Sequence, residues 1–241
     1  MLLLAHRGAS ADAPENTLPA FAEAVRQGAD GVELDAMVCG SGEVVVCHDE
    51  DLLRLGGIST RVAQTPLWKL ERTKLRVDPC HTPAGVPSLE AVLDLLPEDF
   101  LINIELKCGD VNDRGLALKV GALVTRRGME ARVLVSSFNP LCLWRLGAAY
   151  PTLRRGYLLA PDRPWFTQAR VVAPLVSTFS IHPCEVDCTP RRVSEWRAGG
   201  LEVAAWTVDS VARARALEAM GVRYCITNRP RELRDGLGAP A

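Results

Sequence analysis

The chain has 241 residues, 48% of them hydrophobic, and its 28 basic and 29 acidic residues leave a formal net charge of −1. This balance lacks the basic surface of nucleic-acid-binding proteins and the polybasic segments of membrane-surface proteins. From the charge balance we expect no nucleic-acid partner. No segment is apolar for long enough to span a membrane, so we also expect no stable membrane insertion. These properties do not predict an oligomeric state.

The chain begins with a short apolar run that leads directly into His6, which predicts a strand over Leu2 to His6. That run is too short for the core of a signal peptide. A helix follows, and then a second apolar strand over Gly31 to Met37. The residues from Val38 to Cys47 turn at two glycines and predict a hairpin that brings His48 back over the strand ends.

Residues 49–87 form a long stretch that is rich in glycine and proline and has little periodicity. An insertion of this length after a strand is usually functional, for example as a lid or a substrate wall. It offers Trp68 and several arginines, although the sequence does not show which of them face a site: Arg54, Arg61, Arg72 and Arg76.

The rest of the chain alternates short apolar strands with helices. Residues suited to cap helices precede several of them, at Asn16 or Thr17, Ser88, Asn139 and Thr189. A weaker helix is expected around Trp165 to Val172. The remaining strands are predicted at Phe100–Leu106, Val133–Ser137, Gly156–Leu159, Ser177–Ile181, Val203–Trp206 and Tyr224–Thr227. Eight strand-helix units predict a (β/α)₈ TIM barrel, with residues 1–241 as one catalytic domain and 49–87 inserted after the second barrel strand.

The eight cysteines contain no CxxC pair, and a protein of this size needs no disulfides for stability. We therefore expect reduced thiols and a cytoplasmic protein. Cys184 and Cys188, close to His182, come nearest to the spacing of zinc ligands, but no second cysteine pair follows them.

Charged residues gather where the predicted strands end. Glu33 and Asp35 lie two residues apart in one strand, and Glu105 and Lys107 do so in the next, so each pair projects from one face. His6, Arg7 and His48 are predicted to lie near these two pairs. Together the residues would provide metal ligands, proton carriers and groups that bind oxyanions. Metal-assisted attack on a phosphate ester needs these groups.

Each of these residues also has a structural interpretation. Glu33 and Asp35 could form a solvated strand edge or ion pairs, and Glu105 with Lys107 could form a simple salt bridge. His6 and His48 could be structural histidines. Buried acids without partners are costly within an apolar strand, which favours metal binding for the carboxylates.

Several motifs along the chain resemble the signature of the glycerophosphodiester phosphodiesterase family. In chain order they are His6-Arg7-Gly8, Pro14-Glu15-Asn16-Thr17, Glu33-Leu34-Asp35, His48-Asp49 and Glu105-Leu106-Lys107. Further matches follow at residues 136–138, 206–208 and 226–230. The closing motif departs from the family pattern, which usually has an aspartate at the position of Asn228 and a smaller, acidic run at residues 223–225. We expect these departures to affect local packing or substrate fit and to leave the chemistry intact.

The resemblance implies one divalent metal ion, Mg²⁺, Ca²⁺ or Mn²⁺, held by Glu33, Asp35 and Glu105. It also implies an acid/base pair of His6 and His48; we assign His6 as the acid and His48 as the base, although the sequence does not decide between them. The implied reaction is hydrolysis of a glycerophosphodiester to sn-glycerol 3-phosphate and an alcohol. Arg7 and Lys107 are expected to bind the phosphoryl oxygens.

Four further residues are expected to contact substrate or to orient the loops around it. Glu15 and Asn16 belong to the first loop, Trp206 offers a flat apolar wall, and His182 lies at a strand end, where a pocket role and a structural role remain equally open. Two other functions stay as alternatives: a phosphodiesterase that acts on lipid head groups, and a non-catalytic barrel that binds phosphate esters. Fold alone does not separate them.

Overall fold

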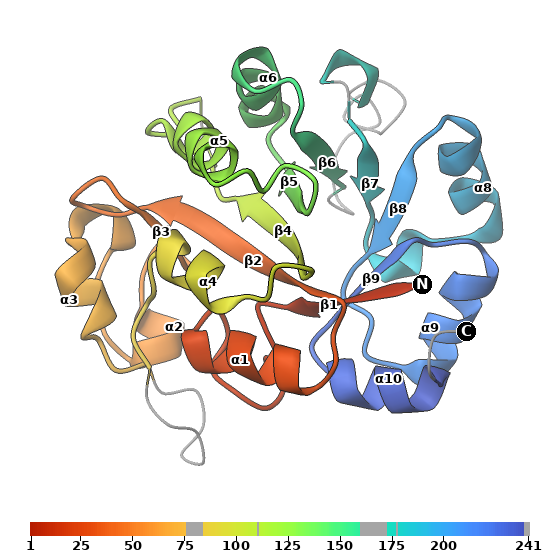
Figure 1. Cartoon of the computed structure of the whole chain (residues 1–241), viewed down its shortest axis with the longest axis horizontal. Helices are drawn as coiled ribbons and strands as arrows, with labels where there is room; N and C mark the ends of the chain where they lie inside the picture. The colour runs from red at the N-terminus through yellow and green to blue at the C-terminus, as the bar shows by residue number, and fades with distance from the viewer. Residues whose placement is uncertain (76–83, 110, 160–172, 177, 239–241) are drawn as a thin grey trace.

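The computed structural model describes residues 1–75, 84–109, 111–159, 173–176 and 178–238 (Figure 1). The helix expected at residues 165–172 and Arg76 of the insertion lie outside these ranges. Eight parallel strands close into a barrel, because β1 pairs with both β2 and β9. The strands are β1 (Leu2–His6), β2 (Gly31–Val38), β4 (Leu101–Leu106), β5 (Val133–Ser137), β6 (Arg154–Leu158), β7 (Ser180–His182), β8 (Glu202–Ala205) and β9 (Tyr224–Thr227). The predicted TIM barrel is confirmed.

Helices surround the barrel in Figure 1. They are α1 (Leu18–Arg26), α4 (Leu89–Leu95), α5 (Leu116–Arg126), α6 (Pro140–Ala149), α8 (Pro190–Ala198), α9 (Val211–Ala219) and α10 (Pro230–Leu237). Four of them begin at predicted caps, because the side chains of Thr17, Ser88, Asn139 and Thr189 each accept a hydrogen bond from a backbone N–H of the first turn. Among the described helices, none combines the length and the apolar character that crossing a membrane requires.

Side-chain alternation along the strands separates an outer core from the barrel interior. On β2, Val32, Leu34 and Ala36 pack in the main hydrophobic cluster with residues of the surrounding helices, so Glu33 and Asp35 face inward. Part of the interior is apolar and is filled by a cluster of Leu4, Ala204, Tyr224 and Ile226. Polar side chains on β2 and β4 occupy another part of it, toward the carboxyl ends of the strands.

The insertion folds against a short strand, β3 (Val44–Val46), which pairs antiparallel with β2 as the predicted hairpin requires. It contains α2 (Leu53–Gly56), a 3₁₀ turn (Val62–Gln64) and α3 (Leu67–Glu71), and these share a small buried cluster with the hairpin. At the hairpin turn, Gly40 donates its N–H to Thr65 O at 2.8 Å, and a Cβ there would lie 2.6 Å from the Thr65 backbone. Glycine is therefore required where the hairpin meets the insertion.

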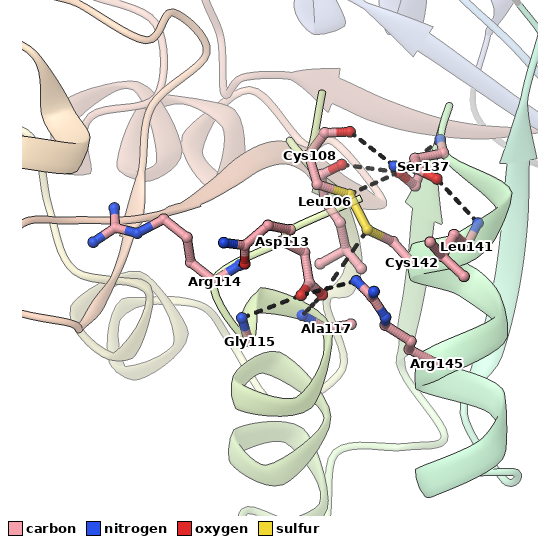
Figure 2. Close-up of a disulfide and its surroundings, with 12 residues drawn as sticks. Leu106, Cys108, Asp113, Arg114, Gly115, Ala117, Ser137, Leu141, Cys142 and Arg145 are labelled. Carbon is pink, nitrogen blue, oxygen red and sulfur yellow. Dashed lines mark hydrogen bonds and ion pairs between the residues drawn. A yellow bond between two sulfur atoms is a disulfide. The ribbon is translucent and has the colours of Figure 1, made fainter. Parts of the chain in front are cut away.

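One expectation about the cysteines is wrong. Cys108, in the loop after β4, and Cys142, in the first turn of α6, are joined by a disulfide with their Cα atoms 7.3 Å apart (Figure 2). Beside it, Asp113 accepts backbone N–H groups at the start of α5 and pairs with Arg145 of α6 at 3.1 Å. The pairing was not predictable because the two cysteines are 34 residues apart and meet only when consecutive strand-helix units pack. Five other described cysteines are free.

Candidate active site

Three carboxylates meet at the carboxyl ends of β2 and β4. One oxygen from each of Glu33, Asp35 and Glu105 lies within 4.8 Å of the others, and all three side chains are buried. The strand register produces this arrangement, because Asp35 is paired with Glu105 across the two parallel strands and Glu33 lies two residues before Asp35. Among the described residues this is the group able to hold a metal ion, and Cys184 and Cys188 form no such group with His182.

The three carboxylates repel one another electrostatically when they are ionised. Burial, together with the charges of Asp35 and Glu105, raises the pKa of Glu33 well above its usual value. Burial and the charge of Asp35 raise the pKa of Glu105 to about 7, although Lys107 acts in the opposite direction. Three buried oxygen donors that resist ionisation together suit a hard divalent cation, which would neutralise their charge.

Two cations flank the carboxylates. Lys107 Nζ lies 2.9 Å from Glu105 Oε1 and 3.6 Å from Asp35 Oδ1, and Arg7 Nε lies 3.2 Å from Asp35 Oδ2. The salt bridge that the sequence offered as the alternative for Glu105 and Lys107 is therefore present. This salt bridge does not exclude a metal ion, because three ionised carboxylates carry more negative charge than one lysine and one arginine neutralise.

His6 is held by the segment that follows the neighbouring strand, β9. Its Nδ1 lies 2.8 Å from Asn228 Oδ1, and the Asn228 amide and backbone N–H groups both donate to Asp209. With its amide nitrogen bound to a carboxylate, Asn228 presents its oxygen to His6, so Nδ1 carries the proton and Nε2 faces Glu33 at 3.9 Å. Burial, reinforced by the charge of Arg7, lowers the pKa of His6.

For Asn228 the sequence predicts a place in local packing or substrate fit, and the structure shows that it also contacts His6 directly. Sequence reasoning also missed Asp209, which fixes the Asn228 side chain in this orientation. Asp209 is the residue after Trp206-Thr207-Val208, so its proximity to a recognised motif was the available signal.

His48 lies at the end of the hairpin and the start of the insertion. Its Nδ1 is 2.7 Å from Asp49 Oδ1, which leaves Nε2 as the ring nitrogen available to a ligand. His6 and His48 thus share one arrangement, in which Nδ1 is engaged by an oxygen acceptor and Nε2 is not. This arrangement suits a pair of proton carriers.

The two residues of the first loop contact other protein residues in this structure. Glu15 accepts a hydrogen bond from Arg7 Nη1 at 2.8 Å. Asn16, with a positive φ of 57°, donates its amide to Asp35 Oδ2 at 2.8 Å and accepts from the Asp35 backbone N–H. Asparagine tolerates this left-handed backbone conformation better than most residues do. Both residues orient charged groups of the site, and a contact with substrate stays a prediction.

His182 and Trp206 differ in their positions. The His182 ring is fully buried, packs over Gly156 and bonds to Ser180 Oγ at 2.8 Å, and burial lowers its pKa to about 3. It does not line the cavities described below. Trp206 does reach the site: its Nε1–H donates to His182 O at 2.8 Å, and its ring meets Phe138 edge-on with centroids 5.9 Å apart.

Two adjoining cavities open over these residues. The smaller, of about 230 Å³, is lined by both histidines, by charged residues of the site and by Phe138 and Trp206. The larger, of about 610 Å³, has several apolar residues in its wall and shares His48, Glu105, Lys107 and Phe138 with the smaller one. Phe138 belongs to a motif recognised in the sequence, at residues 136–138, but no role was predicted for it. Here it stands between the two cavities.

The protein-family model that matches the chain describes the "Glycerophosphoryl diester phosphodiesterase family", and it covers residues 6–232. A glycerophosphodiester phosphodiesterase from Caldanaerobacter subterraneus is 33% identical over 237 residues, 96% of each chain. A human lysophospholipase D is 34% identical over 135 residues, which cover 53% of this chain and 42% of that protein.

The fold is shared with solved structures. A phosphodiesterase from Oleispira antarctica, in complex with the product sn-glycerol-3-phosphate, superposes with a TM-score of 0.86 at 25% identity and covers 98% of this chain and 96% of that one. The match of the family model begins at His6, the last residue of β1, and its range contains the other seven barrel strands and all the residues of the site. The chain therefore belongs to the glycerophosphoryl diester phosphodiesterase family of enzymes.

Proposed function

We propose that this protein hydrolyses glycerophosphodiesters to sn-glycerol 3-phosphate and an alcohol, with one divalent cation held by Glu33, Asp35 and Glu105. The observation that carries the proposal is the meeting of these buried carboxylates within 4.8 Å, beside a cavity lined by two histidines, an arginine and a lysine. Each group has a counterpart in the chemistry of a phosphodiester, which carries negative charge and has a poor leaving group.

The cation would supply Lewis-acid stabilisation of a phosphoryl oxygen, worth several kcal/mol. Arg7 and Lys107 bind the remaining phosphoryl oxygens, since both residues line the smaller cavity. Their ion pairs with Asp35 and Glu105 hold both side chains at the cavity wall before substrate arrives. This preorganisation reduces the entropy that binding costs.

The histidines carry protons. One accepts a proton from the attacking hydroxyl, and the other donates one to the departing alcohol, each through the Nε2 atom left available by the contacts of Nδ1. By family resemblance the first nucleophile is the glycerol 2-hydroxyl, which gives a cyclic phosphate that water then opens. We keep His6 as the acid and His48 as the base.

A second candidate substrate class is the lysophospholipids. The larger cavity has apolar residues such as Met37, Phe138 and Leu141 in its wall, and one relative of the chain is a human lysophospholipase D. The acyl chain on the glycerol of such a substrate would bury part of its length against these side chains. A non-catalytic role is less favoured, because each residue that the chemistry needs is present.

The test is a substrate panel read by ³¹P NMR, which identifies each phosphorus product. It contains glycerophosphocholine, glycerophosphoethanolamine, glycerophosphoglycerol and lysophosphatidylcholine, each with Mg²⁺, Ca²⁺ or Mn²⁺. We expect glycerol 3-phosphate from the first three. Lysophosphatidic acid from the fourth, without glycerol 3-phosphate from the others, would favour the lipid-directed function. No product from any substrate would favour the binding role.

A further inference from the structure

Arg54, an arginine of the insertion, contacts two carboxylates beside the site. Arg54 lies in α2, and its guanidinium binds two carboxylates at once: Nε donates to Asp49 Oδ2 at 2.7 Å, while Nη1 and Nη2 donate to the two oxygens of Glu15 at 2.9 and 2.7 Å. All three guanidinium nitrogens are therefore engaged. The two-point contact with Glu15 uses the planar geometry that lysine lacks.

The contacts continue from these carboxylates to the catalytic groups. The other oxygen of Asp49 lies 2.7 Å from His48 Nδ1. Glu15 Oε1 also accepts from Arg7 Nη1 at 2.8 Å, and Arg7 Nε lies 3.2 Å from Asp35 Oδ2. A chain of alternating charges thus runs from His48 through the insertion to a candidate metal ligand.

Both carboxylates in this chain are held ionised. Burial alone would raise the pKa of Glu15, but the hydrogen bonds of Arg54 and the charge of Arg7 outweigh it and lower that pKa to about 2. Burial alone would also raise the pKa of Asp49, but the hydrogen bonds from Arg54 and His48 outweigh that effect and lower the pKa. An ionised Asp49 can only accept, which requires the proton of a neutral His48 to be on Nδ1.

An isolated surface ion pair contributes little, and the Arg54 side chain is 49% exposed. Its position differs from that of such a pair in two respects. It connects two carboxylates that each contact a different catalytic residue, and Arg54 is not part of the wall of either described cavity. Its contacts therefore indicate a role exerted through protein residues.

We propose that Arg54 is a positioning residue of this active site, which holds Asp49 and Glu15 and, through them, the ring of His48 and the side chain of Arg7. The insertion at residues 49–87 then contributes to catalysis by supplying this arginine. The inference rests on the proposed function, in which His48 and Arg7 act on the substrate.

The experiment compares Arg54→Ala, Arg54→Lys and the matched control Arg72→Ala with the wild type. Arg72 belongs to the same insertion, is exposed and lies over the Trp68 ring at 5.7 Å. For Arg54→Ala we expect kcat to fall by roughly 10- to 100-fold, the scale of a small misplacement of a catalytic group, with KM and metal affinity changed much less. Arg54→Lys should recover part of the loss, and Arg72→Ala should match the wild type.

A double-mutant cycle with Asp49→Asn tests the route of the effect. If Arg54 acts on His48 through Asp49, the loss of kcat in the double variant should be smaller than the combined losses of the two single variants. Fully additive losses would overturn the part of the proposal that assigns this route. Wild-type kcat in Arg54→Ala, with an active wild type, would overturn the whole of it.

A measurement without turnover separates this inference from the proposed function. The ¹⁵N NMR signals of the imidazole report which ring nitrogen of His48 carries the proton. We expect the Nδ1–H form in the wild type and a mixture of forms in Arg54→Ala. An unchanged His48 signal would contradict the inference. A wild type without phosphodiesterase activity, whose His48 signal still responds to Arg54→Ala, would overturn the proposed function alone.

Discussion

At the scale of single residues, the site follows from the cost of burying charge. Three carboxylates at the end of β2 and β4 cannot all stay ionised without cations, and Arg7 and Lys107 supply only part of the compensation. The spacing of Glu33 with Asp35 and of Glu105 with Lys107 made this visible in the sequence. The contacts that orient the histidines were less visible, because Asn228 lies 222 residues from His6.

Replacing one ligand should reveal the metal site directly. Glu105→Gln keeps the shape of the side chain but removes its charge, so we expect affinity for the divalent cation to fall by more than about 100-fold, the upper end of the loss from outer-sphere changes. Isothermal titration calorimetry measures it. Glu90→Gln, which removes a surface carboxylate paired with Arg126, is the control and should bind metal normally. Unchanged affinity in Glu105→Gln would remove that residue from the ligand set.

The histidines should affect turnover and leave metal binding intact. We expect His48→Ala to bind the cation as the wild type does and to lose roughly 10²- to 10⁴-fold in kcat, the usual contribution of a general acid or base. Calorimetry and steady-state kinetics on the same preparation give both quantities. A variant with wild-type kcat would show that His48 carries no proton in the reaction.

An activated substrate separates the acid from the base. Nitrophenolate leaves without a proton, so a glycerophospho-4-nitrophenyl ester does not need the acid. With His6 as the acid, His6→Ala should regain most of its rate on this ester relative to glycerophosphocholine, whereas His48→Ala should not. Recovery in His48→Ala instead would exchange the two roles.

At the scale of elements, the strands and helix caps were predictable because local signals specify them. Short apolar runs gave the barrel strands, and Thr17, Ser88, Asn139 and Thr189 cap helices as their positions indicated. The short helices of the insertion were not predictable. Segments of four or five residues are unstable alone and form here because they bury Leu55 and Leu70 against the hairpin.

The contact between β6 and β7 explains why His182 is absent from the site wall. Gly156 leaves room over β6, and the His182 ring fills it; a Cβ at Gly156 would lie 2.4 Å from Nε2 of that ring. A strand-end position alone could not reveal this, because the direction of the ring depends on a neighbour 26 residues earlier. The structure shows His182 buried and hydrogen-bonded to Ser180, and the predicted contact with substrate stays a prediction.

The buried His182 should make stability depend on pH. Its folded pKa of about 3 lies below the unfolded value near 6.5, so the unfolded state binds the extra proton and stability decreases as pH falls from 6.5 toward 3. The contribution has a slope of up to about 1.4 kcal/mol per pH unit. Urea unfolding at pH 7 and pH 5 should show a smaller difference in His182→Asn than in the wild type. Equal differences would show that His182 is not buried as a neutral ring.

At the scale of the whole molecule, the barrel brings six distant parts of the chain to one mouth. The end of β1 supplies His6 and Arg7, β2 and β4 supply the carboxylates, and the insertion supplies Arg54. The segment after β8 supplies Trp206 and Asp209, and the segment after β9 supplies Asn228. The family signature identified most of the residues in direct contact with the cavities. It could not identify the supporting contacts, because these depend on how the insertion and the closing segment pack on the barrel.

On the proposed function, turnover requires a divalent cation held by Glu33, Asp35 and Glu105. The deciding measurement is glycerol 3-phosphate release from glycerophosphocholine by enzyme stripped with chelator, before and after single divalent ions are added back. We expect no release from stripped enzyme and restored release that saturates at one bound ion per chain. Full activity in enzyme shown to contain no metal would contradict this requirement.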